Sequence, residues 1–243
     1  MKFSIVTISY NQGRYLKQCI ESVLSQKNVD IEYIIVDPGS SDNSREIINS
    51  YKEIKKIYKK DKGPADGLNN GFKIATGDFF GFINSDDYLL PNSISKLQNE
   101  ILKSNASFIS GKGLEILNGK SNIISPTKLT LDKMLYQSSI IFQPSTFFSK
   151  ILYNKINGFN KENRTCWDYE LFTDFLTVGA EHHLFEEPIA AFRVYPESIT
   201  GSGRLKKQIK IDMNRVFKKY KNRDYNYFDK SINIYQRILN KLS

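Results

Sequence analysis

Short apolar runs alternate with helix-patterned segments along the first ninety residues of this 243-residue chain, and this alternation restricts the fold more than any other feature. The runs are apolar on both faces, which is typical of strands in a parallel sheet that helices cover on both sides. The predicted strands are Lys2 to Ile8, Ile31 to Val36, Ile54 to Tyr58 and Phe79 to Ile83. The predicted helices are Arg14 to Gln26, a segment through Ile47 and Ile48 that Asp42 or Asn43 caps, and Ala65 to Ala75. The pattern predicts successive right-handed βαβ units, an α/β architecture suited to nucleotides.

The rest of the chain has a looser pattern that predicts a mixed sheet. Short strands are expected near Phe108, Ile116 and Ile123, over Phe142 to Phe148 and His183 to Phe185, and over Ala190 to Val194. Helices are expected over Asn92 to Leu102 and Trp167 to Val178. We therefore expect one domain over residues 1–203, with halves at 1–90 and 91–203, and a helical tail over residues 204–243.

The net charge of +9 lies entirely in the tail. Residues 1–203 hold 23 Lys and Arg against 23 Asp and Glu, whereas residues 204–243 hold 12 against 3. Apolar residues recur there at helical spacing, which predicts two basic amphipathic helices. The apolar faces of such helices more often pack on the parent domain or on a partner than on lipid, but weak attachment to an anionic membrane, at about 1 kcal/mol per basic residue, is a further hypothesis. Nucleic acid is the weaker alternative, because the tail has no recognition motif.

Several functional classes are disfavoured by what the sequence lacks. The usual dinucleotide fingerprint and the Gly-x-x-x-x-Gly-Lys phosphate loop are both missing, which argues against a dehydrogenase or an ATPase. Cys19 and Cys166 are isolated from each other, without metal-ligand or redox spacing, and fit a reduced compartment. The amino terminus resembles neither a secretory signal nor a spanning helix, so we expect a cytoplasmic protein.

Two adjacent acids, Asp86 and Asp87, follow the fourth predicted strand directly. The carboxyl ends of the strands are where open α/β sheets bind ligands, and paired carboxylates there suit a hard divalent cation that can hold a diphosphate. The alternative is that both acids open a turn and cap a helix that starts near Pro91.

Other polar residues are predicted at the same edge. Asp37 follows the second strand and can accept hydrogen bonds from a nucleobase or a ribose, although a turn acid held by Gly39 is the alternative. Thr7, Ser9 and Asn11 end the first strand and could border the same base.

The loop from Lys62 to Gly71 joins the third strand to its helix. Its glycines allow close approach and the helix amino terminus favours anions, so Lys62 and Asp66 are candidate pocket residues. A Pro-initiated helix with Asp66 as an acid in its first turn remains the alternative.

Three segments together resemble family 2 of the inverting glycosyltransferases: Ser4 to Thr7, Val36 to Ser40, and Asn84 to Asp87. The likeness extends to about Ser202. It implies a GT-A fold, with a Rossmann-like nucleotide-binding half over 1–90 and an acceptor half over 91–203, and a nucleotide-sugar donor bound with Mn²⁺ or Mg²⁺. It also implies that Asp37 contacts the base, Asp86 the ribose or metal, and Asp87 the metal and diphosphate. Asn84 stands where the family more usually has an acid.

The segment Cys166 to Phe172 resembles the acidic motif of the same family, and Asp168 matches its catalytic base. An inverting transfer is one in-line displacement, so a carboxylate must take the proton of the incoming hydroxyl. Glu170 is two residues away and cannot share the helix face of Asp168. Without the resemblance, Asp168 would be interpreted as an acid that favours the helix dipole.

Two further segments resemble parts of such enzymes. Gln143 to Thr146 is similar to an acceptor-side strand, and Phe192 to Thr200 is similar to a terminal loop over the diphosphate, where Arg193 could neutralise leaving-group charge. Relatives often have His in place of Tyr195 and Arg in place of Leu68.

The resulting hypothesis is a metal-dependent glycosyltransferase that moves one sugar, with inversion, to a glycan or a polyprenyl-diphosphate-linked acceptor. The expected setting is synthesis of a surface polysaccharide such as O-antigen, peripherally on the inner face of the plasma membrane. The alternatives are a nucleotidyltransferase, which would release pyrophosphate, and a catalytically silent scaffold that binds nucleotides.

Overall fold

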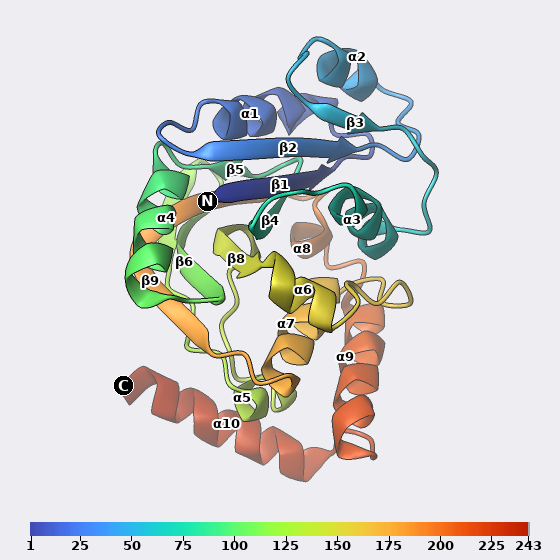
Figure 1. Ribbon diagram of the computed structural model, residues 1–243. Helices are drawn as coiled ribbons and strands as arrows, with labels where there is room; N and C mark the ends of the chain where they lie inside the picture. The colour runs from blue at the N-terminus through green and yellow to red at the C-terminus, as the bar shows by residue number, and fades with distance from the viewer. Residues whose placement is uncertain (243) are drawn as a thin grey trace.

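The computed structural model describes residues 1–242, the last two by their backbone, and folds them around one mixed nine-stranded sheet (Figure 1). The strand order is β3-β2-β1-β4-β8-β6-β9-β5, and β7 pairs with β6. The strands are β1 Lys2–Ile8, β2 Asp30–Val36, β3 Lys55–Ile57, β4 Phe79–Asn84, β5 Tyr88–Leu89, β6 Phe108–Leu117, β7 Lys120–Ile124, β8 Thr146–Ser149 and β9 His182–Val194. The helices are α1 Gly13–Leu24, α2 Ser44–Asn49, α3 Pro64–Lys73, α4 Ser93–Ser104, α5 Leu131–Leu135, α6 Lys150–Lys155, α7 Trp167–Thr177, α8 Ile199–Ser202, α9 Lys206–Lys221 and α10 Tyr227–Leu242.

The first half has the predicted parallel arrangement. Strands β3, β2, β1 and β4 are parallel neighbours, and β1 and β4 are buried on both faces. One core cluster packs α1, α2 and α4 on one face of the sheet, and a second packs α3, α6, α7 and α9 on the other. All the polar segments that follow these parallel strands therefore emerge at one edge of the sheet.

The second half differs in detail from the prediction. The strands expected near Phe108 and Ile116 are one strand, β6, and the two expected around His183 and Ala190 are one strand, β9. The pairing of β6 with β9 shifts register opposite residues 185–190, where Pro188 cannot continue a regular ladder. This bulge lies between the two segments, His183 to Phe185 and Ala190 to Val194, that the sequence pattern predicted as separate strands. Segments β5, α5 and α6 were not predicted, because two to six residues are too few to show a period.

The tail does not behave as one unit. Val216 and Phe217 on α9 are fully buried, and Val216 belongs to the same core as α3 and α7. By contrast, α10 crosses the end of the molecule beside α5, with no other element on its far side (Figure 1). Within residues 1–242, no helix combines the length and the apolar character needed to span a bilayer. The tail predicted over 204–243 is thus one core helix and one surface helix, with Ser243 outside the described residues.

Candidate functional site

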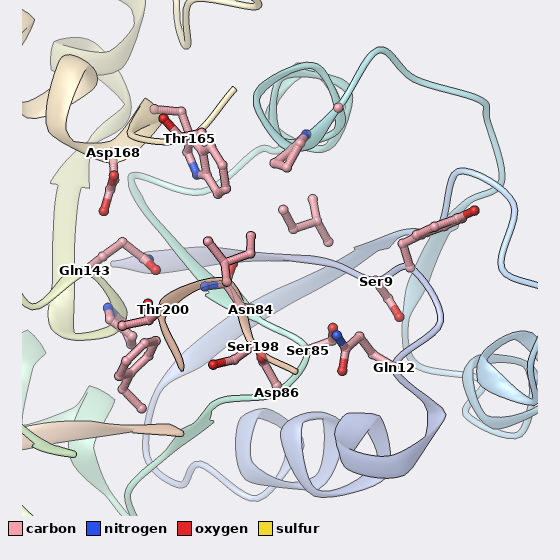
Figure 2. A pocket seen from close by; sticks show the side chains of 18 of the residues that line it. Ser9, Gln12, Asn84, Ser85, Asp86, Gln143, Thr165, Asp168, Ser198 and Thr200 are labelled. Atoms are coloured by element: carbon pink, nitrogen blue, oxygen red, sulfur yellow. The ribbon is translucent and has the colours of Figure 1, made fainter. Parts of the chain in front are cut away.

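A cavity of about 900 Å³ opens at the edge of the sheet where the parallel strands end (Figure 2). Its walls come from the ends of β1 and β4, the loops after β2 and β3, the start of α3, the start of α7 and the segment around α8. The lining residues include Ser9, Gln12, Pro38, Gly39, Lys60, Asp61, Asn84, Asp86, Gln143, Thr165, Trp167, Asp168, Tyr195, Thr200 and Arg204. Segments far apart in the sequence therefore form one pocket, with polar and apolar side chains in its wall.

The paired acids after β4 take different positions in this cavity. Asp86 lines it, and its Oδ2 accepts a hydrogen bond of 2.9 Å from the Tyr195 hydroxyl. Asp87 is fully buried behind it, where Oδ1 accepts from the backbone N–H of Arg193 at 3.0 Å and Oδ2 lies 3.5 Å from the Asn84 amide. Burial raises the pKa of both carboxyls, and the charge of Asp86 raises the pKa of Asp87 further. Two acids so close together would be stabilised by a cation in front of them.

Arg193 holds this pair in place and does not line the cavity. Its guanidinium donates to the backbone carbonyl of Asp86 and to Gln18, and it lies 5.0 Å from the ring centre of Tyr15 and 4.6 Å from that of Tyr88. Contacts with both rings and with the carbonyl fix the end of β9 against the turn after β4. Sequence reasoning predicted Arg193 at the diphosphate, whereas its contacts orient Asp86.

Two buried oxygen atoms near the cavity have no hydrogen-bond partner among the described residues: Asp37 Oδ2 and Ser9 Oγ. The other oxygen of Asp37 accepts from the N–H groups of Gly39 and Ser40 at 2.8 and 2.9 Å and from Arg45 Nε at 3.1 Å. Burial raises the pKa of Asp37, but these hydrogen bonds outweigh it and lower the pKa overall. Unpartnered buried oxygens are costly, so both atoms are suited to a polar ligand.

Asp37 and Asp87 are fully buried and do not line the cavity, and neither do four other predicted residues: Thr7, Asn11, Lys62 and Asp66. The Thr7 hydroxyl is buried 3.0 Å from that of Tyr33, and Asn11 Oδ1 accepts from the backbone of Ser41 at 2.8 Å. Asp66 pairs with Lys161 at 2.8 Å. Their contacts support the loops that form the wall.

Asp168 lies across the cavity from Asp86, in the first turn of α7 (Figure 2). Its side chain is half-buried, and Oδ1 accepts from the N–H of Tyr169 at 2.8 Å. Burial raises the pKa of Asp168 above its ordinary value. A carboxylate with this exposure and raised basicity is suited to receive a proton from a bound hydroxyl.

Glu170 occupies a different face of the same turn, as its two-residue separation from Asp168 predicts. Its oxygens accept from Arg215 of α9 at 3.1 and 2.6 Å, and from Asn160 and Asn163 at 2.9 and 2.8 Å. Burial raises the pKa of Glu170, but the hydrogen bonds from Arg215 and the two amides lower it overall. Helix α9 therefore holds the start of α7, and with it Asp168.

We expect Arg215→Met to lower the free energy of unfolding by about 3 kcal/mol, because the buried Glu170 carboxylate loses its two hydrogen bonds from Arg215 and, of its contacts with cations, keeps only the longer ion pair with Lys219 at 3.6 Å. The Glu170 side chain is 1% exposed, so water cannot replace the lost partner. Urea unfolding followed by circular dichroism measures the change. The matched control on the same helix is Lys218→Met, which breaks the exposed pair with Asp224 and should cost less than about 1 kcal/mol. Equal losses in the two variants would contradict this role of the pair.

Sequence reasoning missed two cations that line the cavity, Lys60 and Arg204. Lys60 lies in the loop after β3, two residues before the lysine that was predicted. Arg204 follows Gly203, whose left-handed backbone, with φ of 62°, ends α8. The signal for Arg204 was its position as the first basic residue after the terminal loop, but it was counted with the tail.

The sequence is similar to those of known proteins. The family model described as "Glycosyl transferase family 2" matches residues 4–161. An uncharacterised glycosyltransferase of Nostoc is 40% identical over 102 residues, which are 40% of this chain and 32% of that protein. Chondroitin synthase of Pasteurella multocida is 28% identical over 98% of this chain and 26% of its own length. The chain thus spans about a third or less of these two relatives.

Solved structures share the fold. Staphylococcus aureus TarS 1–349 in complex with UDP-GlcNAc superposes with a TM-score of 0.75 at 18% identity, over 98% of this chain and 72% of that one. The mannosyltransferase PcManGT of Pyrobaculum calidifontis, in complex with GDP-Man and Mn²⁺, gives 0.69 at 13% identity, over 98% and 69%. The predicted GT-A fold, with its parallel half and mixed sheet, is confirmed.

Proposed function

The chain belongs to glycosyl transferase family 2, and we propose that it moves one sugar, with inversion, from a nucleotide diphosphate sugar to a hydroxyl of a glycan or lipid-linked glycan. The observation that carries this proposal is the placement of Asp86 and Asp168 on opposite sides of one cavity. An in-line displacement needs a site for the leaving diphosphate on one side of the sugar and a base on the other.

The nucleoside end of the donor is assigned to the loops after β1 and β2. Asp37 Oδ2 would accept from the base, and the Ser9 hydroxyl would bond the base or the ribose, which gives both buried atoms a partner. Backbone at Pro38 and Gly39 lines the wall beside them. The complexes of TarS with UDP-GlcNAc and of PcManGT with GDP-Man support a nucleotide-sugar as the ligand class.

The residues after β4 fit a divalent cation. Asp86 and Asp87 offer hard carboxylate oxygens at a place where burial disfavours two negative charges. Within residues 1–242, no group of three or more His, Cys, Asp or Glu side chains could hold a metal ion. Asp86 would therefore bind Mn²⁺ or Mg²⁺ together with diphosphate oxygens, and Asp87 would support it from behind. A bound cation supplies charge stabilisation to the leaving diphosphate.

The chain's own residues would then perform the transfer. Asp168 accepts the proton of the acceptor hydroxyl as that oxygen attacks the anomeric carbon, and the bond from that carbon to the diphosphate breaks. Lys60 and Arg204 face the cavity and would attract the phosphates, while Arg193 keeps Asp86 oriented. Trp167 lines the cavity next to Asp168 and offers a ring face to a sugar.

The acceptor is proposed to be a surface-polysaccharide intermediate, O-antigen being one such polymer, carried on a polyprenyl diphosphate and reached from the cytoplasmic side. Support comes from the glycan polymerases among the relatives, chondroitin synthase and hyaluronan synthase of Pasteurella multocida. Cys19 and Cys166 are buried free thiols, which fits a reducing compartment.

A panel of UDP-, GDP- and dTDP-sugars, each with and without Mn²⁺, tests the function. One donor is expected to raise the thermal midpoint only with the cation, and prolonged incubation with that donor should release nucleoside diphosphate. Release of pyrophosphate from a sugar phosphate and a nucleoside triphosphate would instead identify a nucleotidyltransferase. Binding without any turnover, with or without glycan acceptors, would identify a silent scaffold.

A further inference from the structure

Helix α10 is attached to the rest of the molecule by its polar side. The side chains that face the body are Asp229, Asn233, Gln236 and Asn240. Asn233 Nδ2 donates to the carbonyls of residues 136 and 137 at 2.7 and 2.8 Å. Gln236 accepts from the Ser138 hydroxyl at 2.6 Å, and Asn240 donates to the Ser138 carbonyl at 3.0 Å. This spacing of three or four residues holds one face of the helix against the segment after α5.

The opposite face of α10 is apolar and exposed. Its aromatic and aliphatic side chains are 46–90% exposed: Tyr227, Phe228, Ile234, Tyr235, Ile238 and Leu239. A helix that serves only its own domain turns such a stripe toward the core. Here the side chains of the stripe are exposed to solvent, and Figure 1 shows no other element on the far side of α10. A continuous exposed patch of this kind indicates an interaction surface.

The charge around this stripe is positive. Lys230 and Arg237 are exposed and, at 100° per residue, lie along one edge of the stripe; the Arg237 guanidinium also donates to the Gln137 carbonyl at 3.1 Å. The tail holds 12 basic residues against Asp212, Asp224 and Asp229. Each of these acids is engaged: Asp212 with the Thr165 hydroxyl at 2.7 Å, Asp224 with Lys218 at 3.5 Å and Asp229 with Arg223 at 2.6 Å. Lys230 and Arg237 therefore give that edge of the apolar stripe a positive charge.

We propose that the outward face of α10 binds an anionic lipid bilayer, with the helix lying in the plane of the interface. Tyr227, Phe228 and Tyr235 suit the boundary between headgroups and acyl chains, and the basic edge suits anionic headgroups. A second copy of the chain is the poorer occupant, because two tails of net charge +9 would repel each other across the contact. Helix α9 takes no part, since its apolar face already packs in the core.

This inference goes beyond the proposed sugar transfer and does not rest on it, because lipid binding is measured without donor or acceptor. If both hold, the attachment places the cavity next to a membrane that carries the acceptor.

Co-sedimentation of the full chain with vesicles tests the proposal. Vesicles of equal parts phosphatidylglycerol and phosphatidylcholine are expected to bind at least about tenfold more tightly than phosphatidylcholine alone, and 1 M salt should weaken the binding. The double variant Tyr235→Glu with Ile238→Glu should lower the affinity at least about tenfold, and Lys230→Gln about fivefold. The matched control is Ile151→Glu, on α6, whose side chain is 73% exposed; it should bind as the unchanged protein does.

Three results would overturn the proposal. The first is equal or no binding to the two kinds of vesicle, and the second is equal weakening by the α10 variant and the α6 control. The third is a dimer of the unchanged protein that the α10 variant dissociates, without any vesicle binding. Both substituted side chains are exposed, and an unchanged thermal midpoint confirms that the variant is folded.

Discussion

Replacing Asp168 with Asn is expected to lower kcat of sugar transfer about a thousandfold and to leave the dissociation constant of the donor within about twofold. Asn keeps the shape of the side chain but cannot accept the proton of the acceptor hydroxyl. The donor is assigned to the far side of the cavity, around Asp37 and Asp86, so its contacts stay intact. Release of nucleoside diphosphate gives the rate, and titration calorimetry gives the donor affinity.

The pH dependence of kcat/KM gives a second test of Asp168 as the base. Because Asp168 works as the deprotonated base and burial raises its pKa, kcat/KM should rise with pH through that pKa and then level off. The residual rate of the Asn variant should lack this step. Asp132→Asn is the control, since Asp132 is an exposed acid on α5 that does not line the cavity. A variant at residue 168 with more than a tenth of the normal rate would remove Asp168 from the mechanism.

Replacing Asp86 with Asn is expected to weaken Mn²⁺-dependent donor binding about a hundredfold, because it removes the carboxylate that faces the cavity. Donor binding in the absence of metal should change little. Since the pKa values of Asp86 and Asp87 are raised, protons compete with the cation, and the metal-dependent part should also fade as the pH is lowered.

Calorimetric titration of the donor, with Mn²⁺ and with EDTA, separates the metal-dependent part of donor binding from the metal-independent part. The control is Asp78→Asn at the opposite end of β4, where the carboxylate bonds the backbone of Lys2 at 2.8 Å and is far from the cavity wall. Asp87→Asn tests whether the buried acid also holds the cation or only supports Asp86. An undiminished metal response in both variants at 86 and 87 would place the ligand elsewhere.

The parallel half and the acids that follow its strands could be predicted because they follow from local rules. Apolar runs identified β1, β2 and β4. Because parallel strands end at one edge of the sheet, Asp37 and Asp86, which follow β2 and β4, were expected at the same edge. The position of Asp168 came from resemblance alone, because nothing in the period of α7 distinguishes it from a helix-dipole acid.

Side-chain directions at the strand ends could not be predicted. Ser9 lies just beyond the last residue of β1 and faces the cavity, whereas Thr7 is still inside the strand and points to Tyr33. Asn11 has a positive φ of 53°, which no periodicity reveals. Whether Lys60 or Lys62 faces the cavity is likewise decided by the loop after β3, where neither strand nor helix spacing applies.

The corner between α9 and α10 has a mechanical consequence. The Arg223 guanidinium donates to both oxygens of the buried Asp229 at 2.6 Å, and this ion pair connects the end of α9 to the start of α10. Arg215 of α9 in turn binds Glu170 on α7, the helix that carries Asp168. Any surface that holds α10 would therefore also set the tilt and the height of the cavity mouth above it. Access to an acceptor would then depend on the acceptor's own length and flexibility, because these contacts connect α10 through α9 to the part of the molecule that carries the cavity.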